Sequence, residues 1–222
     1  MNKKIAIFSM ALSLFSGIAH ADLNFGTNDD DSNDKYKAGV DYEIIKPEIE
    51  NSNKTGEVNV INFFSYGCLP CVDTTKKMEE WKMKMPYYAQ MNNSPVSPTI
   101  ASSYPARIYF TLEKLNRLDL NMPFLEESSN GKTDFSKFDI LTSWFDGRGI
   151  KTEDFKKGFD SNEVIGKVYS APSVMKTYNI DSIPTITIAG KYKITASEIN
   201  THKDDLKDLV TFLVEKARAK EE

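Results

Sequence analysis

The sequence VNVINFFSYGCLPC, residues 58–71, joins an apolar, β-favouring run to two cysteines that lie three positions apart. Its first part, Val58–Ser65, is typical of a short buried strand in the centre of a sheet. Pro70 suits the first turn of a helix, where the missing N–H of proline costs little. The stretch predicts a central strand that leads through the cysteine pair into a helix.

The residues after the cysteines carry the pattern of that helix. Met78, Trp81 and Met85 recur at i, i+3 and i+7, which is the spacing of one helical face. Cys71 lies seven positions before Met78, so the same face carries Cys71 toward the core. Cys68 stands at the junction of strand and helix, where we expect it to be exposed.

This position predicts a reactive first cysteine. The N-terminus of a helix presents unpaired N–H groups and about half a positive charge, and both stabilise a thiolate. We therefore expect Cys68 to have a depressed pKa and to be the attacking sulfur. Cys71, one turn deeper, then resolves the mixed disulfide by attacking Cys68.

Two other interpretations of the pair explain the sequence less well. A disulfide stabilises a protein more as its loop lengthens, and Cys68–Cys71 closes a very short loop. A zinc site usually needs four nitrogen or sulfur ligands, whereas residues 22–222 contain two cysteines and one histidine, His202. We predict redox chemistry without a metal or a cofactor, and a solvated His202 at the start of the last helix.

Composition excludes several other classes of protein. The chain has 222 residues, of which 40% are hydrophobic, so it is neither a disordered nor a collagen-like chain. Its 28 Lys and Arg are outnumbered by 32 Asp and Glu, which argues against a strongly basic nucleic-acid binder. The length permits one substantial core, or a core with a subdomain inserted into it.

The first 21 residues have the three-part pattern of a secretory signal. A basic start at Lys3 and Lys4 precedes the apolar run Ile5–Ile18, and small residues follow at Ala19 and Ala21. The run is short for a membrane-spanning helix, which usually needs about 20 apolar residues, so an uncleaved anchor is the weaker alternative. We predict cleavage after Ala21 and a periplasmic protein. In an exported chain, a single closely spaced cysteine pair favours redox chemistry.

The rest of the chain alternates between strand and helix signals. Asp22–Lys37 is acidic and polar, and we expect a solvated arm there. Tyr42–Ile45 is a candidate first strand, and Pro95 and Pro98 bracket another extended segment. The pattern of Ser103–Ile180 predicts mostly helices, and we expect Pro172 to kink or split one of them.

The last forty residues return to a sheet and end in a helix. The run Thr185–Thr195 predicts two strands with a tight turn at Ala189-Gly190. A final helix follows, for which we expect Thr201 to be the N-terminal cap. Just before the first of these strands stands Ile183-Pro184-Thr185.

Together these features resemble a known fold. The strand–CxxC–helix unit, the late Ile-Pro-Thr and the following hairpin are similar to a thioredoxin fold. Pro184 lies 113 positions after Cys71, much later than in a bare thioredoxin domain. A thioredoxin fold interrupted by helices is the architecture of the DsbA family of periplasmic thiol:disulfide oxidases.

Shorter stretches of the chain are also similar to DsbA. They are Tyr42-Glu43 with Pro47, Phe63-Phe64-Ser65, Gly149-Ile150-Lys151 and Gly190-Lys191-Tyr192. The resemblance covers nearly all of the chain from about Asp41 onward.

The resemblance implies an α/β (α+β) protein with a thioredoxin fold and an inserted all-helical domain. We predict five segments: a signal peptide at 1–21, a polar N-terminal arm at 22–40, the first part of the thioredoxin fold at 41–102, the helical domain at 103–180, and the second part of the thioredoxin fold at 181–222.

The same resemblance implies how the site works. In that family the proline before the last hairpin is cis and packs against the cysteines, and Pro184 takes that position. The backbone of Ile183 would then pair with a substrate peptide as an added strand. The partners implied are unfolded or folding exported proteins with reduced cysteines, and a quinone-linked membrane protein of the DsbB type that reoxidises the pair. No feature of the sequence forces oligomerisation, so we expect a monomer.

Two positions depart from the family. DsbA typically carries Pro-His between its cysteines, whereas this chain has Leu69-Pro70. Less stabilisation of the thiolate makes the pair a weaker oxidant. The strand position six before the first cysteine, usually a buried acid, is Asn62, which we expect to be a satisfied polar strand residue. The resulting hypothesis is a DsbA-like oxidase of intermediate potential.

Other functions remain open at this point. A disulfide isomerase or reductase of the same fold is one alternative, although the arm at 22–37 is too short and polar for a dimerisation domain. A non-catalytic peptide-binding chaperone is another. Tyr66, Tyr104 and Phe110 would be candidates for its surface, but such residues are more often in the core.

Overall fold

The computed structural model describes residues 34–49 and 56–219. The predicted signal peptide, most of the predicted arm and the connector at 50–55 lie outside the described residues. Within the described ranges, no helix is long and apolar enough to cross a membrane.

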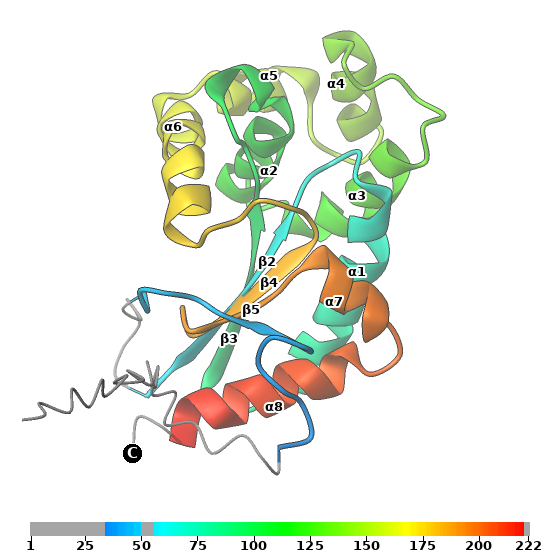
Figure 1. Cartoon of the computed structure of the whole chain (residues 1–222). Helices are drawn as coiled ribbons and strands as arrows, with labels where there is room; N and C mark the ends of the chain where they lie inside the picture. Colours follow the sequence, from blue (N-terminus) through cyan, green and yellow to red (C-terminus); the bar gives the residue numbers. More distant parts are fainter. Residues whose placement is uncertain (1–33, 50–55, 220–222) are drawn as a thin grey trace, which may run out of the picture. The chain divides into compact units, whose positions relative to one another are not determined.

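The centre of the fold is a five-stranded mixed sheet with the strand order β1-β5-β4-β2-β3 (Figure 1). β2 and β3 are parallel, and the other neighbouring pairs are antiparallel. The strands are β1 (Glu43–Ile44), β2 (Val58–Phe64), β3 (Ala89–Pro95), β4 (Thr185–Ile188) and β5 (Tyr192–Ile194).

Most of the helices lie between β3 and β4 in the sequence. α1 (Leu69–Lys82) connects β2 to β3, and α7 (Ala196–Thr201) and α8 (Leu206–Ala219) follow β5. Between β3 and β4 come η2 (Ile100–Ser102), α2 (Tyr104–Lys114), η3 (Leu118–Leu120), α3 (Asn121–Ser129), α4 (Phe138–Asp146), α5 (Thr152–Phe159) and α6 (Asn162–Thr177). This order is a thioredoxin fold with a helical insertion, which confirms the predicted fold class.

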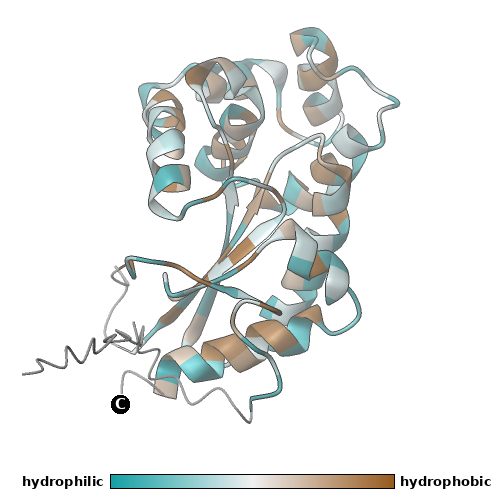
Figure 2. Cartoon of the chain, in the orientation of Figure 1, coloured by the Kyte–Doolittle hydropathy of each residue, from teal (hydrophilic) through white to brown (hydrophobic). Residues whose placement is uncertain are grey.

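Side-chain alternation along β2 builds two different faces of the sheet. Val58 and Val60 join a core that includes Met78 and Trp81 of α1 and the apolar stripe of α8. Figure 2 shows that stripe as the brown residues of α8. Phe63 points the other way and packs with residues near the end of α6. The sheet is therefore covered on both faces beside the strand that leads to the cysteines.

The helical insertion has an aromatic core of its own. Phe155 of α5 is fully buried and stacks on Phe145 of α4, with ring centroids 4.7 Å apart. Phe124 of α3 contacts Phe145 at 4.9 Å. The same cluster extends to Phe64 and Cys71, so the packing of the inserted helices is continuous with the surroundings of the cysteine pair.

The hairpin before the C-terminus agrees with the sequence. β4 and β5 pair with Ile188 opposite Tyr192, and the turn between them contains Ala189 and Gly190 at φ of 56° and 66°. Both values lie in the left-handed region that two-residue hairpin turns require. α6, in contrast, runs through Pro172 as one helix and is not split.

Two elements differ from the sequence prediction. The third strand is Ala89–Pro95 and not the segment between Pro95 and Pro98. Only Ala89, Met91 and Pro95 of this edge strand are buried, so its apolar signal is weak. Thr201 ends α7 and does not cap the last helix. The overlooked start signal is a capping box, in which Thr195 and Glu198 exchange hydrogen bonds.

The end of the predicted arm and His202 were both wrongly expected to be solvated. The Tyr36 side chain is 3% exposed, and its hydroxyl donates to Asp205 at 2.9 Å. The imidazole of His202 is 12% exposed and lies between Asp41 (2.8 Å) and Asp205 (3.0 Å). Although burial acts to raise it, hydrogen bonds from Tyr36 and His202 hold the pKa of Asp205 below its ordinary value. These contacts tie residues 36–41 to the turn before α8.

The aromatic core predicts a large stability loss from one truncation. Phe155→Ala should lower the free energy of unfolding by about 3–5 kcal/mol, because it opens a cavity among stacked rings. Urea denaturation of the oxidised protein measures this loss. Lys156→Ala, at the neighbouring exposed position of α5, is the matched control and should change stability by less than about 0.5 kcal/mol. Equal effects of the two variants would contradict the packing described here.

Candidate active site

Cys68 and Cys71 form a disulfide at the N-terminus of α1, with their Cα atoms 5.3 Å apart. Cys68 is the N-cap residue, and its Sγ accepts the backbone N–H of Cys71 at 3.2 Å. Cys71 is fully buried, whereas Cys68 is partly exposed. Solvent can therefore reach one residue of the pair and not the other.

The dipeptide between the cysteines lies on the surface. Leu69 is 66% exposed, which is unusual for a large apolar side chain, and Pro70 is exposed in the first turn. α1 has no acidic residue in its first turn. The helix N-terminus favours a negative charge at Cys68, and no carboxylate in that turn opposes it.

Sheet topology brings Ile183 and Pro184 to the end of the sheet from which β2 leads to the cysteines. β4 is antiparallel to β2 with Thr185 opposite Phe63, so β4 begins where β2 ends. The Ile183–Pro184 peptide bond is cis, and Pro184 is buried. Cys71 belongs to an apolar cluster that extends into the inserted helices. Ile183 and Cys68 both pack against this cluster.

The backbone of Ile183 is available to a partner. Its N–H and C=O take part in none of the backbone–backbone hydrogen bonds formed by the described residues outside helices and strands. Its side chain is only partly buried. Ile183 thus presents two polar backbone groups beside the cysteine pair.

Asn62 lies beneath α1 and is only half satisfied. Its amide nitrogen donates to Thr75 Oγ1 at 3.0 Å and to Asn93 Oδ1 at 2.8 Å, and Asn93 donates in turn to Glu79 at 2.8 Å. The buried Oδ1 of Asn62 has no hydrogen-bond partner among the described residues. The expectation of a satisfied side chain is therefore wrong for its carbonyl oxygen.

The aromatic residues considered for a chaperone surface are mostly internal. Tyr66 is 7% exposed, and its hydroxyl donates to Asn121 at 2.8 Å. Tyr104 and Phe110 are partly buried and pack against the aromatic core of the insertion. Burial raises the pKa of both tyrosines, that of Tyr66 strongly. These rings do not form an exposed aromatic patch.

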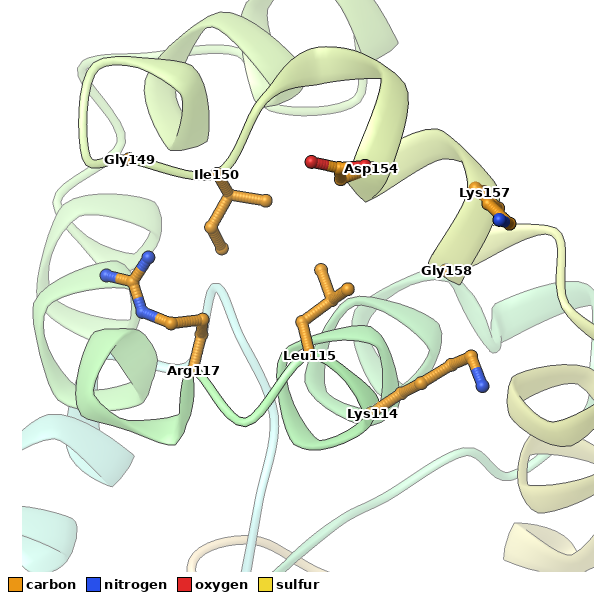
Figure 3. A pocket seen from close by; sticks show the side chains of 8 residues that line it. All are labelled: Lys114, Leu115, Arg117, Gly149, Ile150, Asp154, Lys157 and Gly158. Carbon is orange, nitrogen blue, oxygen red and sulfur yellow. The ribbon is translucent and has the colours of Figure 1, made fainter.

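A cavity away from the cysteine pair lacks the groups for disulfide exchange. It has a volume of about 420 Å³ and lies between the end of α2 and α5 (Figure 3). Leu115 and Ile150 point into it, and none of its eight lining residues is a cysteine or a histidine. Lys114 is bound to Glu163, and Arg117 to Asp119.

The described residues also contain no group of three or more His, Cys, Asp or Glu side chains that could hold a metal ion.

The fold and the site define a class of protein. A disulfide at the N-terminus of the helix that follows the central strand, beside a cis-proline at the same end of the sheet, is the arrangement of a thiol:disulfide oxidoreductase.

Comparison with known proteins narrows this class. A thiol:disulfide interchange protein DsbA from Burkholderia cepacia is 24% identical over 206 residues, which cover 90% of this chain and 91% of the relative. An uncharacterized protein of Haemophilus influenzae is 27% identical over 185 residues, 82% of this chain and 77% of its own. The crystal structure of Pseudomonas aeruginosa DsbA superposes with a TM-score of 0.74 at 23% identity, covering 84% of this chain and 97% of the other.

No family model matches the chain. The likeness to DsbA extends over most of both chains in sequence and in structure. The chain is a DsbA-like thiol:disulfide oxidoreductase.

The different exposure of the two sulfurs predicts different reactivity of the two thiols. In a Cys71→Ala variant, Cys68 should react rapidly with iodoacetamide, with a midpoint below the ordinary thiol pKa of about 8.5. In a Cys68→Ala variant, Cys71 should react slowly in the native state and rapidly in urea. Alkylation rates measured by mass spectrometry between pH 4 and 9 test both statements. An unreactive Cys68 near neutral pH would rule it out as the attacking group.

Proposed function

We propose that this chain is an exported DsbA-like oxidase that donates the Cys68–Cys71 disulfide to folding exported proteins. The observation that carries the proposal is the placement of a partly exposed Cys68 at the N-cap of α1, bonded to a fully buried Cys71. The relatives named thiol:disulfide interchange protein DsbA support disulfide exchange as the reaction.

The exchange takes place in two steps. A substrate thiolate attacks Cys68 Sγ, the Cys68–Cys71 bond breaks, and Cys71 leaves as a thiolate that takes up a proton. A second substrate thiolate then attacks the substrate sulfur of the mixed disulfide, and Cys68 leaves as a thiolate. The substrate gains one disulfide, and the enzyme takes up the two electrons as two reduced cysteines.

The helix N-terminus favours release of Cys68 in the second step. A leaving thiolate there receives the N–H of Cys71 and the positive end of the α1 dipole. Stabilising the reduced form makes a dithiol pair more oxidising. Leu69 and Pro70 add no charge to this stabilisation, and Asn62 cannot ionise, so we propose an intermediate potential.

Substrate binding is proposed to use the segment before β4. An extended peptide can add to the backbone N–H and C=O of Ile183 as a strand, in the manner of β-augmentation. Pro184 would hold this segment against the cysteine pair. Leu69, exposed between the cysteines, would contact the same peptide.

The remaining parts of the proposal concern partners and processing. The reduced pair would be reoxidised by a DsbB-type membrane quinone reductase. The chain would reach the periplasm through a signal peptide at 1–21 and act as a monomer. Segments 41–102 and 181–222 would form the thioredoxin fold, and 103–180 the inserted domain.

A disulfide isomerase or reductase of the same fold is the alternative, and the Leu69-Pro70 dipeptide is the observation that favours it. Proline before the second cysteine is similar to thioredoxin, a reductant. A non-catalytic chaperone is less well supported, because Tyr66 is buried.

The reduction potential separates these functions. Equilibration with glutathione should place the Cys68–Cys71 couple between the DsbA value of about −120 mV and the thioredoxin value of about −270 mV. The oxidised protein should also introduce disulfides into a reduced substrate faster than it repairs a scrambled one. A potential near that of thioredoxin would refute the oxidase and favour the reductase.

Removal of the buried cysteine should trap substrates. In Cys71→Ala, the Cys68 thiolate can attack a disulfide of an exported protein and release one substrate thiolate. No neighbouring enzyme thiol can then displace the substrate from Cys68, so Cys68 should remain bonded to exported proteins under oxidising conditions. Non-reducing gels and mass spectrometry of the purified variant detect these adducts. The double variant that also carries Cys68→Ser is the control and should trap none. If Cys71→Ala also yields no adducts, Cys68 is not the exchanging sulfur.

A further inference from the structure

A cavity of about 230 Å³ opens beside the residue that precedes Cys68. Its walls come from the turn before α1, from α2, from α3 and from the loop between α3 and α4. Four aromatic rings line it, those of Tyr66, Tyr104, Phe124 and Phe135. It is separate from Ile183 and Pro184, neither of which lines it.

The aromatic walls are fixed before any ligand arrives. Tyr66 meets Phe124 edge to face at 4.7 Å, and Phe124 meets Phe135 in the same manner at 5.0 Å. The hydroxyl of Tyr104 donates to the carbonyl oxygen of Phe135 at 3.2 Å, which ties α2 to the opposite wall. A preformed pocket avoids much of the entropy cost of ordering side chains on binding.

These walls offer ring surface and few free polar groups. The hydroxyl of Tyr66 is bonded to Asn121, and that of Tyr104 to Phe135. At the rim, the exposed carboxylate of Asp134 accepts hydrogen bonds from the Ser136 hydroxyl and backbone N–H. An occupant therefore gains mainly by burying apolar surface against rings, and aromatic side chains pair favourably with other rings.

The cavity is lined by the residue next to the cysteine pair. Gly67 lines it, is exposed, and has a φ of +81°. A Cβ built on Gly67 would meet no atom within 4 Å. Adjacent Cα atoms are about 3.8 Å apart, so one lining residue of the cavity is the direct chain neighbour of Cys68. A peptide whose cysteine bonds to Cys68 can therefore place a neighbouring side chain at the cavity.

We infer that this cavity is a specificity subsite, which binds an aromatic side chain located within two residues of the reactive cysteine of the substrate. The inference deepens the proposed function and rests on it, because it assumes that peptides exchange disulfides at Cys68. The subsite would make the exchange selective for cysteines that stand beside an aromatic residue.

The test compares dithiol peptides that differ at one position. Phe, Lys or Ala is placed at each position within two residues of one cysteine, and the other cysteine is flanked by alanines. The full mature protein, oxidised, is mixed with each peptide, and loss of the Cys68–Cys71 disulfide is followed by acid quench and mass spectrometry. We expect the best Phe peptide to react about tenfold faster than its Ala counterpart, from partial burial of one ring.

Filling the cavity should remove this preference. Ser128→Phe places a ring into the cavity from α3, and Thr133→Trp does so from the loop, where substitution is better tolerated. The ratio of the Phe to the Ala rate should fall to about one in both variants. Ser170→Phe is the matched control, because Ser170 is exposed on α6 and also bonds a carbonyl of the preceding turn. It should keep the wild-type ratio.

Each result separates the subsite from the exchange itself. Equal Phe and Ala rates at every position, a ratio unchanged in both filled variants, or faster reaction of Lys peptides through Asp134 would overturn the subsite while leaving the oxidase intact. If no peptide reduces the wild-type disulfide, the proposed function fails, and the subsite fails with it.

Discussion

The antiparallel pairing of β4 with β2 is the constraint on which the site depends. With Thr185 opposite Phe63, the strand that delivers the cysteines ends where the strand that carries the proline begins. A slip of one residue would turn Ile186 and Ile188 out of the core that they share with α1 and α8. The register is therefore held by the core. The helical insertion can vary without separating two parts of the site that lie more than a hundred residues apart.

Beneath α1, uncharged polar groups occupy the place where an ionisable residue would alter the chemistry. Asn62, Thr75 and Asn93 form a hydrogen-bonded chain that reaches Glu79 near the surface. The unpaired Oδ1 of Asn62 costs about 1–3 kcal/mol if no partner meets it. Because Asn62, Thr75 and Asn93 do not ionise near neutral pH, none of the three can supply the proton that the leaving Cys71 thiolate takes up.

The parts of the fold that could be predicted are those with a local signal. The apolar run of β2, the spacing of Met78 and Trp81, and the turn at Ala189-Gly190 each lie within a short window of sequence. The bounds of β3 were not predicted, because Gln90 and Asn92 of this edge strand are exposed and its apolar pattern is weak. α7 was not predicted as a separate helix, because it is only six residues long.

The candidate site follows the same division. Cys68, Cys71 and their helix could be predicted, since one continuous stretch forms them. The aromatic cavity could not, because its walls come from four separate segments. The unpaired Oδ1 of Asn62 could not be predicted either, because the hydrogen-bond partners of this side chain come from α1 and β3 and meet it only in the folded chain. His202 was misjudged for a similar reason, since its partner Asp41 lies 161 positions earlier.

The contacts of Tyr36 and His202 have a consequence for the order of events during synthesis. A chain emerges from its N-terminus, so residues 36–41 appear among the first of the folded part. Their partners His202 and Asp205 appear among the last, 161 and 169 positions later. Tyr36 can therefore form its contacts with His202 and Asp205 only after nearly the whole polypeptide has been made. The contacts of residues 36–41 with His202 and Asp205 therefore form late in folding, after the C-terminal part of the chain has been made.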